Sequence, residues 1–304
     1  MALITLHKKI KVNMSQNFES QSCGTLYVIA TPIGNLSDIT RRAIETLEKV
    51  DWVAAEDTRH SKPLLHSLGI NQNLLSLHEH NEAQRTEQLL EKLQNGESGA
   101  LISDAGTPLI NDPGYFLVKR LRQEGVQVVP IPGPSAVITA LCAAGLPTDR
   151  FTYEGFLPAK SSKRILALEA LVSETRTLVF YESPHRLMDC LQNMQQVFGD
   201  DREMVVAREL TKKFEQFVSG SVGEVVTYFT DNSDKVRGEF VLMLTGAELK
   251  TDADSEAKLV EVDKMIQIML KQSLPVKQIS EMIAEITGEK KKPIYQRVLE
   301  LKAC

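Results

Sequence analysis

The chain has 304 residues, of which 42% are hydrophobic and 25% are charged, a composition typical of a globular protein with two or three domains. Its 35 Lys and Arg residues against 40 Asp and Glu residues give a net charge of -5. That charge excludes a protein that coats nucleic acid non-specifically, although it leaves room for a local basic patch. No run of 18 apolar residues occurs, so the sequence predicts no membrane span.

The N-terminal residues do not have the composition of a signal peptide. Residues 1–12 carry three lysines but neither an apolar core nor a small-residue cleavage site. We expect residues 1–23 to form a disordered N-terminal extension, with Met14 as an alternative start. The four cysteines are scattered without a C-x-x-C spacing, so neither a zinc site nor a disulfide framework is predicted. A reducing, cytoplasmic location is therefore expected.

Residues 24–147 alternate short apolar runs with amphipathic stretches. The runs at 26–30, 52–55, 74–77, 100–103 and 126–131 are predicted strands. Helical patterns lie between them, among them residues 39–50, 82–94 and 113–124. This alternation predicts an N-terminal α/β domain with a parallel sheet covered on both faces, ending near the linker at 145–147.

Residues 148–249 have a different rhythm. Predicted strands lie at 151–156, 177–181, 204–207, 214–219 and 239–244, with helices around 164–171 and 185–198 and little helix between the later strands. A second α/β domain with a mixed, partly antiparallel sheet is expected. The polar residues 250–258 form a predicted linker. After it, three helical patterns at 258–271, 275–286 and 292–301 predict a small C-terminal helical domain over residues 258–304.

Three loops rich in small residues follow predicted strands of the first domain. They are residues 31–38 (TPIGNLSD), 103–108 (SDAGTP) and 130–136 (PIPGPSA). The G-x-G-x-x-G, Walker and kinase signatures are missing. Because open α/β sheets bind ligands at the carboxyl ends of their strands, these loops predict a cleft for a flat heterocycle with an aminoacyl tail. We interpret Asp112 as a helix N-cap, with Pro113 at the first helical position.

Charged residues follow two strands of the second domain, at 181–186 (YESPHR) and 208–215 (RELTKKFE). Facing the three small-residue loops, they indicate a ligand site between the domains. The run at 56–60 (EDTRH) follows the second strand near the same sheet edge and is a candidate lining of a substrate channel. The histidines show no zinc spacing, and no metal site is predicted.

Eight stretches occur in an order that resembles a known family. They are IATPIGNLSDIT, AAEDTRHS, ISDAGTPLINDPG, IPGPSA, YEGFLPAK, FYESPHR, ARELTKKFE and GEFVLML. Together they resemble the tetrapyrrole-methylase superfamily, also called class III S-adenosylmethionine methyltransferases, and within it the bacterial 16S rRNA (cytidine 2′-O) methyltransferases. The resemblance covers residues 24–304. It implies two α/β domains with the cofactor in the cleft between them, and a homodimer. It also implies methyl transfer from S-adenosylmethionine to a ribose 2′-hydroxyl in the small ribosomal subunit.

The resemblance also implies site residues, carried over position by position. The implied cofactor contacts are Pro32, Ile33, Gly34, Ser103, Asp104, Ala105, Gly106, Pro108, Ser135, Ala136, Glu182, Leu210 and Gly238. The candidates for chemistry are Glu182, Arg208, Glu209 and Lys212. Of these we expect Glu182 to handle the proton, with Arg208 and Lys212 holding an RNA phosphate or the developing alkoxide. Lys212 could itself act as a base only if its pKa were strongly lowered.

Two alternatives stay open. The first is a methylase of a small tetrapyrrole or a diphthine-type substrate. Against it, the first loop has the sequence Pro-Ile-Gly-Asn, where corrin and porphyrin methylases carry a motif like Gly-x-Gly-x-Gly-Asp. In addition, Glu182 occupies a position where those enzymes tend to carry Met. The second is a ligand-sensing regulator, because residues 274–288 and the lysines at 290–292 resemble a helix-turn-helix with a basic start to its last helix. After a complete cofactor cleft, such a unit is better interpreted as an RNA-docking appendage.

Overall fold

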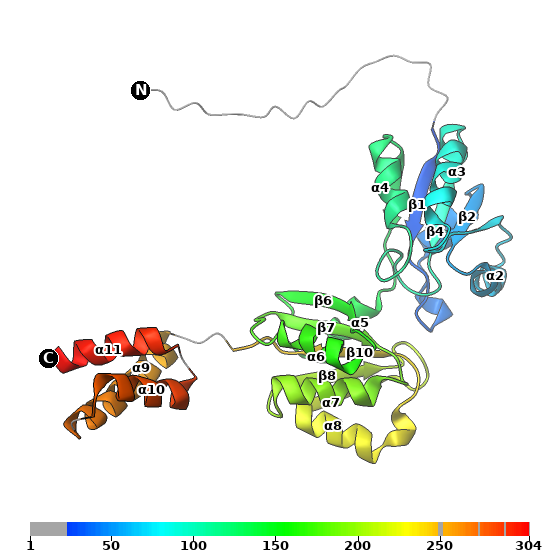
Figure 1. The fold of residues 1–304 in the computed structure, drawn as a ribbon. Helices are drawn as coiled ribbons and strands as arrows, with labels where there is room; N and C mark the ends of the chain where they lie inside the picture. The colour runs from blue at the N-terminus through cyan, green and yellow to red at the C-terminus, as the bar shows by residue number, and fades with distance from the viewer. Residues whose placement is uncertain (1–22, 249–251, 273, 289, 304) are drawn as a thin grey trace, which may run out of the picture. The chain divides into compact units, whose positions relative to one another are not determined.

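The computed structural model describes residues 23–248, 252–272, 274–288 and 290–303. The predicted N-terminal extension lies outside these residues, apart from Cys23. The chain divides into two compact units, residues 1–246 and 247–304, which are described separately below. Figure 1 shows both units and labels elements of each.

The first half of the larger unit holds a five-stranded sheet in the order β3-β2-β4-β1-β5. Every pairing in it is parallel, as the alternation of strands and helices predicts. The strands are β1 (Thr25–Ile29), β2 (Trp52–Ala55), β3 (Leu74–Ser76), β4 (Gly99–Ile102) and β5 (Gln127–Ile131). The helices are α1 (Arg41–Leu47), α2 (Thr58–Ser67), α3 (Glu82–Gln94), α4 (Tyr115–Gln123) and α5 (Ala136–Ala144), with a 3-10 turn η1 (Leu36–Asp38).

Both faces of this sheet are buried. Ile29 and Val53 belong to one apolar cluster, whereas Leu26 and Trp52 belong to another on the opposite face. Successive residues of a strand point to opposite faces, so a strand buried on both sides reads as a continuous apolar run. Because the strands are parallel, the loops after β1, β4 and β5 all lie at the same edge of the sheet. These are the three loops rich in small residues.

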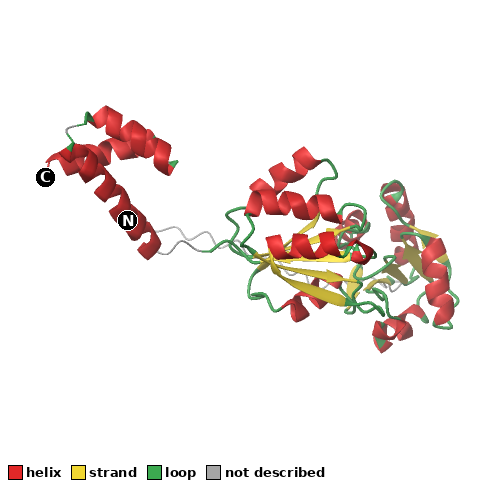
Figure 2. Ribbon diagram, turned by 90° about the horizontal axis from the view of Figure 1, so that it is seen from below, coloured by secondary structure: helices red, strands yellow, loops and turns green. Residues whose placement is uncertain are grey.

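The second half of this unit holds a mixed sheet in the order β6-β7-β10-β8-β9. Only β6 and β7 pair in parallel, which confirms the predicted mixed character. The strands are β6 (Phe151–Phe156), β7 (Thr177–Glu182), β8 (Glu203–Arg208), β9 (Gln216–Ser221) and β10 (Phe240–Leu244). The helices are α6 (Ser161–Glu169), α7 (Leu187–Phe198) and α8 (Val222–Asp231), followed by the turn η2 (Ser233–Lys235). Figure 2 shows the strands in yellow and the helices in red.

Helix α8 corrects the expectation of little helix between the later strands. It begins with a capping box, in which the Ser221 side chain accepts from the Glu224 backbone N–H and the Glu224 side chain accepts from Ser221. Its apolar residues Val222, Val225 and Phe229 are buried in the core beneath the sheet. This three- and four-residue spacing is the periodicity of a helix packed on one face.

Helix α5 joins the two halves of the larger unit. Val137, Ala140 and Leu141 of α5 belong to one buried cluster with Val179 of β7 and Val241 of β10. The helix follows β5 of the first sheet directly, and its apolar face covers the second sheet. This packing brings the loop edge of the first sheet next to the strand ends of the second.

The smaller unit consists of α9 (Asp252–Lys271), α10 (Val276–Thr287) and α11 (Lys291–Ala303). They share a core made of Val262, Ile266, Ile279, Ile283, Ile294 and Val298. Helix α9 begins inside the segment 250–258 that the sequence interpretation assigned to a linker, whose polar composition is also compatible with the first turns of a helix. Helix α10 ends at Gly288 in the left-handed conformation, a common helix stop. No helix among the described residues is both long and apolar enough to cross a membrane.

Candidate functional site

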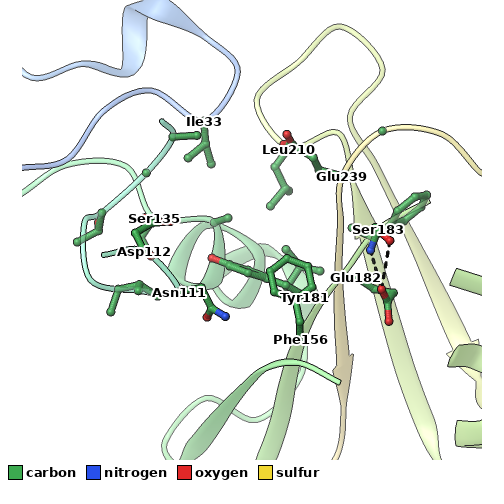
Figure 3. Close-up of a pocket in the computed structure, with 18 of the residues that line it drawn as sticks. Ile33, Asn111, Asp112, Ser135, Phe156, Tyr181, Glu182, Ser183, Leu210 and Glu239 are labelled. Atoms are coloured by element: carbon green, nitrogen blue, oxygen red, sulfur yellow. Dashed lines mark hydrogen bonds between the residues drawn. The ribbon is translucent and has the colours of Figure 1, made fainter. Parts of the chain in front are cut away.

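A cavity of about 340 Å³ lies where the loops of the first sheet meet the strand ends of the second. Figure 3 shows Ile33, Asn111 and Asp112 along one side and Leu210 and Glu239 across from them. A volume of a few hundred Å³ is usual for a small-molecule site. Its lining contains three carboxylate side chains, Asp112, Glu182 and Glu239. No Lys, Arg or His lines it among the described residues. The cavity therefore favours a ligand with positive charge.

Most of the cofactor residues implied by the resemblance line this cavity. Those that do are Ile33, Ala105, Gly106, Ser135, Ala136, Glu182, Leu210 and Gly238. The others lie outside its lining, although in the same loops: Pro32, Gly34, Ser103, Asp104 and Pro108. Of the candidates for chemistry only Glu182 lines it, whereas Arg208, Glu209 and Lys212 do not.

Backbone hydrogen bonds tie the small-residue loops together. The Thr31 N–H donates to the Gly106 carbonyl at 2.9 Å, and the Gly106 N–H donates back to the Thr31 carbonyl at 3.1 Å. The Thr107 hydroxyl donates to the Pro134 carbonyl at 2.9 Å. Gly106 has a φ of +81°, where L side chains are strained, and a Cβ there would lie 3.3 Å from the Ile33 side chain. The first, fourth and fifth loops thus form one continuous wall.

The opposite wall carries a charged cluster that includes the cavity residue Glu239. The Lys212 ammonium donates to Glu209 at 2.9 Å and to Glu239 at 3.1 Å. Burial opposes the charged ammonium, but the two carboxylates outweigh it and raise the pKa of Lys212. A raised pKa leaves Lys212 a cation that cannot accept a proton at neutral pH. Burial of Glu209 disfavours its ionised carboxylate and by itself would raise its pKa. The hydrogen bond from the Lys212 ammonium outweighs this effect, so the pKa of Glu209 lies below its usual value.

Arg208 and Glu182 are both held by neighbours within the second half of the larger unit. Arg208 is only 7% exposed, and its guanidinium makes long contacts of 3.4 Å to Gln216 and to the Arg237 carbonyl. The Glu182 side chain is fully buried. Its carboxylate accepts from the Ser183 N–H at 2.8 Å (Figure 3) and pairs with Arg186 at 3.2 Å. Glu182 therefore borders the cavity with its charge already matched.

Several cavity residues were not predicted as site residues. Besides Thr107 and Ile110 they include Asn111, Asp112, Phe156, Tyr181, Ser183, Pro184, Glu239, Phe240 and Val241. The aromatic ones come from strands whose apolar pattern indicates core. The sequence signal that could have revealed Asp112 is the presence of a second carboxylate in the loop that already carries Asp104.

The interpretation of Asp112 as a helix N-cap is wrong. Helix α4 begins at Tyr115 with Gly114 at the N-cap, and Gly114 offers no side chain. The Asp112 carboxyl borders the cavity instead. Its burial and the nearby Asp104 raise its pKa to about 6, although a hydrogen bond with Ser103 works in the other direction. Asp112 is thus ionised at neutral pH but titrates close to it.

The run Glu56–His60 contacts Asp104, and none of its residues lines the cavity. The Asp57 N–H donates to Asp104 Oδ1, and His60 Nδ1 lies 3.1 Å from Asp104 Oδ2. Burial and the carboxylates of Asp112 and Asp104 raise the pKa of Glu56. The described residues contain no group of His, Cys, Asp and Glu side chains suited to a metal ion.

Comparison with known proteins places the chain in a family. Residues 25–226 match the model of the tetrapyrrole (corrin/porphyrin) methylases, and residues 256–302 match the RsmI C-terminal HTH domain. The chain is 51% identical over 279 residues to ribosomal RNA small subunit methyltransferase I of Escherichia coli O157:H7, covering 92% of this chain and 96% of that protein. The chain belongs to the ribosomal RNA small subunit methyltransferase I family. The relative from Pasteurella multocida is 48% identical, covering 91% and 97%.

Solved structures support the fold of this family member. Diphthine synthase superposes with a TM-score of 0.55 at 13% identity, covering 73% of this chain and 90% of that one. Uroporphyrin-III-C-methyltransferase from Thermus thermophilus superposes with a TM-score of 0.51 at 19% identity, covering 73% and 94%. These likenesses confirm an α/β fold of tetrapyrrole-methylase type, to which this chain adds a C-terminal helical domain.

Proposed function

We propose that the chain transfers a methyl group from S-adenosylmethionine to the ribose 2′-hydroxyl of a cytidine in 16S rRNA. The observation that carries the proposal is the match to small-subunit rRNA methyltransferases over nine-tenths of the chain, helical unit included. Under this proposal residues 24–147 and 148–249 are two domains that form the cofactor cleft. Residues 258–304 form the helical domain, which docks RNA.

The cavity suits S-adenosylmethionine. Ile33 and Leu210 face each other across it (Figure 3) and offer apolar surface for a heterocycle. Ala105, Gly106, Ala136 and Gly238 leave room for close approach of the backbone. Glu182 and Glu239 border the cavity as carboxylates, which suits a ligand that carries a sulfonium and an amino group. When bound, this cofactor supplies a methyl carbon made electrophilic by the adjacent positive sulfur.

The chain's own residues contribute positioning. Holding a hydroxyl in line with a methyl carbon supplies up to about 7–11 kcal/mol in ideal intramolecular cases. The wall made by the loops at Thr31, Gly106 and Pro134 is cross-linked by hydrogen bonds, which suits it to fix such a geometry. We assign Glu182 to shaping the cavity, because its carboxylate is already engaged by Ser183 and Arg186. Arg208, Glu209 and Lys212 do not line the cavity, and the Lys212 side chain lies beside Gly34 of the first loop.

We also propose that the protein acts in the cytoplasm as a homodimer, as the resemblance implies. Sedimentation equilibrium at micromolar concentration tests the assembly state, and a mass equal to one chain would contradict a dimer. A fluorescent fusion expressed in the source cell tests the location.

One assay tests the reaction. Small subunits and naked rRNA from a strain that lacks this gene are incubated with the protein and methyl-labelled S-adenosylmethionine, and the nucleosides are then analysed by mass spectrometry. We expect label on the ribose of one cytidine. Label on a base would contradict the 2′-O assignment, and no label on rRNA would favour a small-molecule acceptor or a regulator without activity.

A further inference from the structure

One of the three cavity carboxylates has no cationic partner. Glu182 pairs with Arg186, and Glu239 pairs with Lys212. Asp112 takes part in no ion pair among the described residues. The nearby Ser103 hydroxyl lowers the pKa of its carboxyl, but that hydroxyl donates to the carbonyls of Ala105 and Gly106. Asp112 is therefore the cavity carboxylate whose lone pairs are least committed to holding the fold.

The backbone before Asp112 is strained at two residues. Leu109 and Asn111 have φ values of +72° and +68°, a region that L residues with a Cβ rarely adopt. Such conformations persist where the surrounding structure enforces them, and they cluster at functional sites. The Asn111 side chain accepts a hydrogen bond of 2.5 Å from the Tyr153 hydroxyl. It anchors the loop of the first sheet to β6 of the second.

The surroundings of Asp112 make it a better base than an exposed aspartate. It is half-buried, and the titratable groups that interact with it are Asp104, Glu56, Tyr153 and Tyr181. The carboxylates of Asp104 and Glu56 disfavour a negative charge on Asp112. Both tyrosines stay neutral because burial raises the pKa of each. A base whose pKa approaches the working pH accepts a proton more readily while still being ionised.

We propose that Asp112 is the group that accepts the proton of the acceptor hydroxyl. This inference rests on the proposed function, since a ribose hydroxyl must lose a proton when it is methylated. Asp112 takes that proton while the hydroxyl oxygen forms its bond to the methyl carbon and the methyl–sulfur bond breaks. The electron pair of the broken bond stays on sulfur, which becomes a neutral thioether. The protonated Asp112 then returns its proton to water.

The test combines binding with single-turnover chemistry on small subunits that lack the modification. Asp112→Asn is nearly isosteric, and it should slow methyl transfer by about 10²–10⁴-fold. Its affinity for S-adenosylmethionine, measured by calorimetry, should stay within about threefold of wild type, because positioning of the donor does not depend on the proton acceptor. Asp112→Glu should recover part of the rate. The wild-type rate should rise with pH to a plateau with a midpoint near 6, and Asp112→Asn should lack this midpoint.

Two results would overturn the inference. One is an Asp112→Asn rate within threefold of wild type. The other is a tenfold or larger loss of donor affinity that accounts for the slower rate, which would make Asp112 a donor-binding group. If Asp112→Asn does not fold, Asp112→Ser replaces it under the same criteria. Nucleoside analysis of the wild-type product separates this inference from the proposed function. Label on a base contradicts the function whatever the variant does, whereas ribose label with an unaffected variant contradicts only the role of Asp112.

Discussion

Glu82 of α3 caps the N-terminus of α4 by accepting a hydrogen bond from the Gly114 N–H at 3.0 Å. The same carboxylate oxygen accepts from the Phe116 N–H at 2.9 Å and, at 3.4 Å, from Leu117. Glu82 is 5% exposed, and an anion at a helix N-terminus is favoured by the unpaired N–H groups and the helix dipole. Because Glu82 supplies this cap, Asp112 is left to face the cavity.

Replacing Glu82 should destabilise the protein. Glu82→Ala leaves buried N–H groups of α4 without a partner, and we expect a loss of about 2–4 kcal/mol in the free energy of unfolding. Glu82→Gln keeps one acceptor oxygen and should lose less. Urea denaturation at pH 7.5 measures both. The matched control is Glu87→Ala on the same helix, whose exposed pair with Arg120 should contribute less than about 1 kcal/mol. Equal losses at Glu82 and Glu87 would contradict the capping role.

Gly106 should be required for cofactor binding. Gly106→Val places a branched side chain against Ile33 in the cavity wall and should weaken S-adenosylmethionine binding by tenfold or more, about 1.4 kcal/mol. Gly125→Val is the control, because Gly125 has a similar φ of +74° and open space at its Cβ position. Both variants carry a similar backbone strain of roughly 1–2 kcal/mol, so the comparison isolates the effect of the side chain in the cavity wall. Calorimetric titration compares their affinities, and equal affinities would remove this cavity as the cofactor site.

Asp112 should lower stability at neutral pH. Its folded pKa of about 6 lies above the ordinary value of 3.8, so the folded state binds the proton more tightly than the unfolded state. Stability therefore falls as the pH rises from about 4 through 6 and stays lower above that range. Relative to wild type, Asp112→Asn should be more stable at pH 8 by about 1 kcal/mol, a figure reduced for the solvent screening of a half-exposed group. Thermal unfolding between pH 4.5 and 8 measures this difference, and a difference that does not shrink toward acid pH would contradict it.

The basic segment at the start of α11 should contact RNA through two of its three lysines. Lys291 pairs with Glu281, whereas Lys290 and Lys292 are exposed and form no ion pair with a described residue. Each lysine that meets a phosphate releases counterions and contributes about 0.7–0.9 to the salt slope of binding. The double variant Lys290→Ala with Lys292→Ala should therefore weaken rRNA binding and flatten the slope by about 1.5.

Lys291→Ala is the matched control for this segment. Because Glu281 already neutralises Lys291, its removal should change the slope by less than about 0.5. RNA affinity measured from 50 to 250 mM salt compares the three proteins. Curves for the double variant that superimpose on wild type would assign the helical unit to folding or assembly, not to RNA contact. Cofactor affinity should not change in any of them, since the cavity residues all lie in the larger unit.

The sequence by itself was sufficient for the layered architecture. Alternation of apolar runs with helical patterns predicted the parallel first sheet, because a strand covered on both faces must be apolar throughout. Small residues after β1, β4 and β5 located the cavity at the carboxyl edge of that sheet. These loops are visible in the sequence, and open α/β sheets bind ligands at the carboxyl ends of their strands. The capping box at Ser221 was also present in the sequence, and reading it would have revealed α8.

Only the tertiary structure decided which side chains of those loops reach the cavity. Asp112 and Asp104 belong to the same loop, yet one borders the cavity and the other turns to His60. Positive φ values lie on either side of Asp112, and the helix that follows it is capped by Glu82, 32 residues away from Gly114 along the chain. The charge of Glu182 is likewise matched by Arg186 only because the first turn of the following segment folds back onto β7. A local pattern cannot specify such partners, because hydrogen bonds between distant segments form only when packing brings their donors and acceptors within about 3 Å.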